Sequence, residues 1–162
     1  MGRRGIRTFD EFRDEVAKYR LPRILLTALD LKLFTVMGPR PWTIPALAKE
    51  LDVSERGLEI LCRNLAAAGL LAKQGVRYRA MGIARTTLNA AHPAYRGGYL
   101  ELLRNQWEDW TRLTEVVRRG VPVDRDEPDD PEWRRSFTWA MHHRSLDVAP
   151  RVVAQVNVSD AE

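Results

Sequence analysis

Residues 43–80, TIPALAKELDVSERGLEILCRNLAAAGLLAKQGVRYRA, decide the fold of this chain. The stretch opens with a short predicted helix, which Thr43 precedes as the N-cap and which carries Pro45 in its first turn. Three residues of this helix have the spacing of an inward face: Leu47, Ala48 and Leu51. A tight turn at "DVS" then leads into a second element.

Ser54 is the predicted N-cap of a second helix. Its apolar residues stand at i, i+3, i+4 and i+7, the spacing of one helix face: Leu58, Leu61, Cys62 and Leu65. Gly69 suits the C′ position that ends the helix.

Two short segments, 70–73 and 76–80, then flank "QG" as a β-hairpin. Alternation places Val76 and Tyr78 on one face of the hairpin and Arg77 and Arg79 on the other. Helix, turn, helix and two-stranded wing together predict a winged helix-turn-helix. The whole chain is therefore expected to be mainly α, with one small hairpin.

The flanking segments extend this pattern with further helices. Before the winged helix, helices are predicted over 9–20 and 22–37, and Thr8 is the N-cap of the first. After it, we expect a long helix over 99–119, another over 131–145 and a last helical piece kinked at Pro150. The predicted organisation is N-terminal helices at 1–37, the winged helix at 42–82, and helices at 96–162.

Composition indicates a globular protein without a membrane span. Hydrophobic residues make up 44% and charged residues 30% of the 162 residues. No apolar run approaches the roughly 18 residues that a span requires, and no secretory signal opens the chain, so we expect a cytoplasmic protein. The one cysteine, Cys62, excludes an internal disulfide and lies on a helix face typical of a small buried hydrophobe.

A net charge of +4 and a pI near 9.6 raise the question of DNA binding. A winged helix often reads the major groove with the first turn of its second helix. In this chain that turn carries Glu55 and Glu59, which offset Arg56 and Arg63. The wing does carry basic residues, Lys73 among them, so a transcription regulator stays open as the alternative function.

The sequence gives little support for a metal site, a phosphate-binding loop or a calcium loop. His142 and His143 are adjacent on a predicted helix and point about 100° apart, so they do not converge on one metal ion. The sequence YRGGYL, residues 95–100, lacks the preceding strand and the spacing of a phosphate-binding loop. The acidic segment 124–132 lacks the glycine and the terminal Glu of a calcium loop.

Four segments, in order, resemble the N-terminal dimerisation and substrate-binding region of small-molecule O-methyltransferases of the caffeate and bacterial polyketide type. They are ALDLKLFTVM (28–37), the winged-helix stretch itself, WEDWTRLTEVVRRGVP (107–122) and FTWAMHHRS (137–145). The family uses S-adenosylmethionine. The chain departs from the plant pattern at Arg144, where His is usual, and at Trp139.

The resemblance implies a substrate pocket for an aromatic or polyketide-like small molecule. Phe137, Met141 and Ser145 match the segment that walls this pocket in the family, and Trp107 and Trp110 are further candidates on the preceding helix. Packing in the interhelical core is an equally good explanation for each of the five.

The resemblance also implies an intertwined homodimer formed by the N-terminal helices. The expected interface residues are Phe9, Phe12, Leu25, Leu26 and Leu33.

In the family, the Rossmann-like domain that binds S-adenosylmethionine and carries the catalytic base follows the last matching segment. This chain is therefore expected to bind no cofactor alone and to contain no catalytic residue. A truncation, a proteolytic remnant and half of a two-chain enzyme stay open, as does a free-standing module that regulates a full-length relative.

Overall fold

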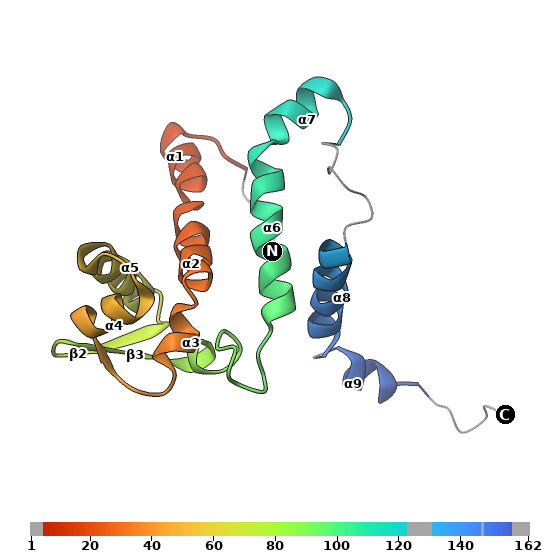
Figure 1. Ribbon diagram of the computed structural model, residues 1–162. Coiled ribbons are helices and arrows are strands. Elements are labelled where there is room, and N and C mark those ends of the chain that lie inside the picture. Colours follow the sequence, from red (N-terminus) through yellow and green to blue (C-terminus); the bar gives the residue numbers. More distant parts are fainter. Residues whose placement is uncertain (1–4, 123–130, 147, 157–162) are drawn as a thin grey trace. The chain divides into compact units, whose positions relative to one another are not determined.

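The computed structural model describes residues 5–122, 131–146 and 148–156, except for the side chains of residues 132 and 133. The chain divides into two compact units, Met1–His92 and Pro93–Glu162. Figure 1 shows their helices and strands in chain order. Most of the acidic segment 124–132 lies outside the described residues.

Three helices open the first unit: α1 (Phe9–Ala17), α2 (Arg20–Asp30) and α3 (Leu33–Met37). Thr8 caps α1 as predicted, because its Oγ1 accepts a hydrogen bond from the Glu11 amide at 3.1 Å while the Glu11 carboxylate accepts one from the Thr8 amide at 3.1 Å. The single helix predicted over 22–37 is wrong. Lys32 adopts the left-handed conformation, with φ 52°, and separates α2 from α3.

The helix-turn-helix consists of α4 (Ile44–Leu51) and α5 (Glu55–Ala67). Asp52 turns the chain in the left-handed conformation, and the Val53 amide donates to the carbonyl of Ala48 at 3.0 Å. The side chain of Ser54 caps α5 as predicted, accepting from the Gly57 amide at 3.3 Å. Thr43 occupies the N-cap position of α4, but its side chain makes no capping hydrogen bond.

The wing is a three-stranded antiparallel sheet with the strand order β1-β3-β2. It comprises β1 (Trp42–Thr43), β2 (Leu71–Gln74) and β3 (Arg77–Ala80). The prediction missed β1, which pairs Trp42 with Tyr78. Val76 was also placed wrongly: it lies in the turn between β2 and β3 and is 74% exposed, whereas Tyr78 and Ala80 are the residues of β3 that face the core.

One hydrophobic core holds the first unit together. Its buried residues come from α2 to α5, the sheet and the 3-10 helix η1 (Gly82–Arg85): Ala28, Leu33, Phe34, Met37, Trp42, Leu47, Ala48, Leu58, Cys62, Leu65, Leu71, Tyr78, Ala80 and Ala84. The indole Nε1 of Trp42 donates to the carbonyl of Met37 at 3.0 Å, so the polar atom of this buried ring is satisfied.

The second unit contains α6 (Gly97–Thr111), α7 (Leu113–Arg119), α8 (Pro131–Ser145) and α9 (Ala149–Val153). Helices α6 and α8 pack side by side and run in opposite directions (Figure 1). Pro150 lies in the first turn of α9, where proline is favoured, so the predicted kink is wrong. Within the described part of the chain, we find no helix of the length and apolarity that crossing a membrane requires.

Candidate functional site

Three of the five predicted pocket residues follow one side of α8. Phe137, Met141 and Ser145 are spaced four residues apart, so they form a stripe along the helix. Phe137 is 40% exposed and Met141 is partly buried. The hydroxyl of Ser145 donates to the carbonyl of Met141 at 2.8 Å.

The other two pocket candidates, Trp107 and Trp110, lie on the second half of α6. Gly98 at the start of α6 packs against the α8 backbone at Trp139. Trp107 and Trp110 are nine and twelve residues further along, about 14 and 18 Å up the helix axis at 1.5 Å per residue. Trp107 is partly buried and Trp110 is 68% exposed. Trp107 and Trp110 therefore lie further along α6 than the turn that faces Trp139.

The glycine pair at the start of α6 serves helix packing. A Cβ built on Gly97 would lie 2.1 Å from Cε1 of Tyr95, and one on Gly98 would lie 2.5 Å from Cβ of Trp139. Protein atoms therefore fill the space beside both glycines, which rules out a phosphate cradle at this position.

The two adjacent histidines belong to an aromatic cluster with Trp139. The ring centroids of His142 and His143 lie 5.6 and 5.8 Å from that of Trp139. His143 Nδ1 accepts a hydrogen bond from the Gly98 amide at 3.2 Å. Among the described residues no group of three or more His, Cys, Asp or Glu is placed to hold a metal ion. The sequence analysis missed the role of His143 in helix packing, and the glycine pair was the signal that pointed to a close helix approach.

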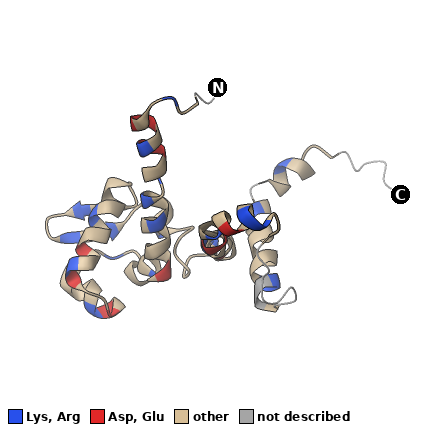
Figure 2. Cartoon of the chain, turned by 90° about the horizontal axis from the view of Figure 1, so that it is seen from above, with Lys and Arg blue, Asp and Glu red and all other residues tan. Residues whose placement is uncertain are grey.

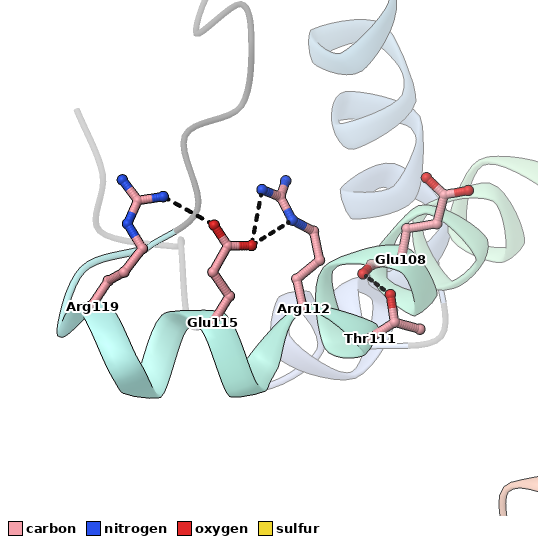
Figure 3. Close-up of polar contacts among 5 residues, drawn as sticks. All are labelled: Glu108, Thr111, Arg112, Glu115 and Arg119. Carbon is pink, nitrogen blue, oxygen red and sulfur yellow. Dashed lines mark hydrogen bonds and ion pairs between the residues drawn. The ribbon is translucent and has the colours of Figure 1, made fainter.

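Helix α6 ends at Thr111, where the prediction had one helix over 99–119. Figure 3 shows the local hydrogen bonds: the Thr111 hydroxyl donates to the carbonyl of Glu108 at 2.6 Å, and Arg112 pairs with Glu115 on α7 at 3.3 Å. Arg119 donates to the other carboxylate oxygen of Glu115 at 3.0 Å. This hydrogen bond and the charge of Arg112 lower the pKa of Glu115. The junction is thus an exposed ion-pair network, which contributes little to stability.

The surface of the helix-turn-helix carries little net positive potential on its second helix. Arg63 donates to Glu59 at 2.6 Å, and this hydrogen bond raises the pKa of Arg63. In Figure 2 basic residues colour parts of the hairpin blue, and residues of both charges alternate along the helices. On the hairpin, the Lys73 ammonium lies 5.3 Å from the centroid of the Tyr78 ring. Neutralised charge on α5 disfavours phosphate binding.

An apolar face of the N-terminal helices is exposed to solvent. It consists of Phe9, Phe12, Val16 and Tyr19, and none of the residues of α1 is buried. The rings of Phe9 and Phe12 stack with centroids 6.4 Å apart. The predicted interface is wrong for Leu33, which is 0% exposed because it packs in the core of the first unit. Leu26 is also buried within the single chain, with 8% of its surface exposed.

This architecture matches a known family. The family model described as the O-methyltransferase dimerisation domain matches residues 15–90. The chain carries the dimerisation domain of the O-methyltransferase family. The match includes α2 to α5, the sheet and η1, so the buried core of the first unit is the core of this dimerisation domain.

Two relatives share sequence beyond the dimerisation domain. The tetracenomycin polyketide synthesis 8-O-methyltransferase of Streptomyces glaucescens is 32% identical over 130 residues, which are 74% of this chain and 38% of that protein. The 3-hydroxy-5-methyl-1-naphthoate 3-O-methyltransferase of Streptomyces sahachiroi is 30% identical over 142 residues, 83% of this chain and 41% of that protein. The chain spans about two fifths of the length of these relatives.

Solved structures show the same fold. An O-methyltransferase family protein from Burkholderia thailandensis is 26% identical with a TM-score of 0.78, over 95% of this chain and 47% of that one. Human N-acetylserotonin methyltransferase, solved in complex with S-adenosylmethionine, is 20% identical with a TM-score of 0.72, over 98% of this chain and 51% of that one. The likeness therefore includes the helices after the dimerisation domain.

Proposed function

We propose that this chain is the dimerisation and substrate-binding part of an S-adenosylmethionine-dependent O-methyltransferase. The methyl acceptor is a hydroxyl of an aromatic or polyketide-like small molecule. The observation that carries the proposal is the 30% identity to a naphthoate O-methyltransferase over 83% of the chain, a longer stretch than the dimerisation domain at residues 15–90. Both relatives act on fused or polyketide-derived aromatics, according to their names.

The cofactor supplies the methyl group, and the residues of this chain position the acceptor. The glycine pair at Gly97 and Gly98 packs against protein atoms and does not fit a nucleotide. This excludes the glycine pair as the cofactor site, and we propose that residues other than these 162 bind the cofactor in the whole protein. An acceptor hydroxyl held against a reactive sulfonium needs mainly correct orientation.

The stripe of Phe137, Met141 and Ser145 on α8 is our proposed wall of the acceptor site. An aromatic ring, a polarisable thioether and a hydroxyl suit a flat molecule with a polar edge. Trp107 and Trp110 on α6 would contact only an acceptor, or a part of one, that extends toward the other end of the helix pair.

The partner of the chain is proposed to be a second copy of itself. Phe9, Phe12 and Val16 on α1, together with Tyr19 before α2, present an apolar face, and a monomer would leave this face in water. Burying it against a second copy would give the hydrophobic interface typical of obligate dimers.

The test is calorimetric titration of S-adenosylhomocysteine into the purified chain, with its mass in solution measured at the same concentrations. A dimer that binds no S-adenosylhomocysteine is expected. Micromolar binding would overturn the assignment of cofactor binding to other residues. A monomer at tens of micromolar would overturn the dimerisation role.

A further inference from the structure

His143 makes a hydrogen bond that only its neutral form accepts. Its Nδ1 lies 3.2 Å from the backbone nitrogen of Gly98, and a backbone N–H can only donate. Nδ1 must therefore present its lone pair, and the ring proton sits on Nε2. The bond joins the last turn of α8 to the first turn of α6.

The helix backbones are close enough at this point to make the contact sensitive to small changes. A Cβ on Gly98 would stand 2.8 Å from the carbonyl carbon of Trp139 and 3.0 Å from the nitrogen of Ala140. Ala140 is fully buried beneath this contact.

The charges around His143 oppose its protonation. Arg96, just before α6, donates from NH1 to the carbonyl of His143 at 3.3 Å, and His142 lies beside it on α8 with its ring centroid 5.6 Å away. The first carboxylate along α6, Glu101, pairs with Arg104 at 3.5 Å. The N-terminus of α6 adds the positive end of the helix dipole.

We propose that the Gly98–His143 hydrogen bond is a pH-sensitive latch between α6 and α8, closed when His143 is neutral and opened when it is protonated. Protonation places an N–H donor against the N–H of Gly98 and a positive charge against the helix N-terminus. Both effects push the last turn of α8 away from α6.

The surroundings also lower the pKa of His143, first through burial and then through His142 and Arg96. A histidine with a lowered pKa in the folded state binds fewer protons there than in the unfolded chain. The latch therefore contributes its full stability above the ordinary histidine pKa of about 6.5, and this contribution falls as the pH drops below that value.

The experiment is an NMR titration of the full chain from about pH 8 to about pH 5, following the Gly98 amide and the His143 ring. The expected result is that the Gly98 signal shifts with the same midpoint as His143. Its protection factor, the exchange rate of an unstructured peptide divided by that of the Gly98 amide at the same pH, should fall about tenfold, as expected for loss of one hydrogen bond.

Two variants provide matched comparisons. H143N keeps an acceptor oxygen near the position of Nδ1 but does not titrate, so its Gly98 protection should stay constant over the same range. H142N removes the neighbouring imidazole and should keep the pH response at Gly98. A wild-type Gly98 signal that does not move while His143 titrates would overturn the proposal, and this outcome requires no variant to fold.

Discussion

The backbone of α6 at Gly98 lies directly against α8 at Trp139. A Cβ built at position 98 would lie only 2.5 Å from the Cβ of Trp139. Real side chains do not approach this closely, so position 98 accepts only glycine without movement of a helix. Both the stripe of Phe137, Met141 and Ser145 and the Gly98–His143 latch depend on this approach.

Replacing Gly98 with alanine should separate the start of α6 from α8. Overpacking of this kind costs about 1–3 kcal/mol, and the neighbours are the Cβ of Trp139 and backbone atoms of α8, which do not rotate away. Thermal unfolding followed by tryptophan fluorescence measures the loss. The matched control is G97A, whose new methyl meets only the far end of the movable Tyr95 ring. Equal unfolding temperatures for the two variants would contradict the close approach at Gly98.

Replacing Phe9 with glutamate should weaken the proposed homodimer without unfolding the chain. Phe9 is the first residue of α1 and 76% exposed, and a carboxylate in the first turn of a helix is favourable. Sedimentation velocity should show a dimer dissociation constant raised about tenfold or more.

The control for this change is V76E, an equally exposed apolar residue in the turn of the wing. V76E should leave the mass in solution unchanged. If F9E sediments as wild type does, the exposed face of α1 is not the dimer interface.

The thiol of Cys62 should be inert in the folded chain. Burial first, and then the charge of Glu59, raise the pKa of Cys62 to about 12. A raised pKa means that the folded state disfavours the thiolate, so stability is complete below the unfolded value of about 8.5 and is lost as the pH rises toward 12.

Because the chain has one cysteine, a thiol reagent reports on Cys62 alone. At pH 8 the native chain should react at least about a hundredfold more slowly than the chain in guanidinium. Rapid labelling of the native chain would mean that α5 opens readily.

How far the sequence determines this structure depends on the range of the interactions. Local signals predicted the helix-turn-helix, because the capping hydrogen bond of Ser54 and the inward spacing of Leu58 and Leu65 are encoded within one helix. The third strand, β1, escaped prediction because two residues carry no periodicity and pair only with distant β3. The burial of Leu33 was not predicted either, because it results from packing against residues that are distant in the sequence.

In the candidate site, too, features encoded within one helix were predicted and contacts between distant residues were not. The resemblance to the family segment selected Phe137, Met141 and Ser145, apolar spacing predicted a helix over 131–145, and the structure has this helix at Pro131–Ser145. The hydrogen bond from Gly98 to His143 spans 45 residues, so no local pattern indicated it. Helix α6 ends at Thr111 and α7 begins at Leu113, a break that apolar periodicity did not predict.

Removing the cap of α5 should destabilise the winged helix. The Ser54 hydroxyl accepts from the Gly57 amide, so S54A leaves that donor without a side-chain partner, at a cost of about 1 kcal/mol. T43A is the matched comparison at the N-cap position of α4, where no such bond exists, and should cost less. Urea unfolding followed by far-ultraviolet circular dichroism measures both. An equal or larger loss for T43A would contradict the capping role of Ser54.

Replacing Met141 with alanine should weaken binding of an aromatic acceptor. Met141 lies midway along the proposed wall, partly buried, and its truncation removes apolar contact worth about 1–2 kcal/mol, or about tenfold in affinity. The probe is 3-hydroxy-5-methyl-1-naphthoate, the acceptor in the name of one relative, and quenching of tryptophan fluorescence reports its binding. The control is T138A on the exposed side of α8, where the hydroxyl only donates to the carbonyl of Arg134. Since T138A leaves the stripe of Phe137, Met141 and Ser145 intact, it should bind the probe as wild type does. Equal affinity in M141A and wild type, with the fold of M141A intact by circular dichroism, would remove Met141 from the acceptor site.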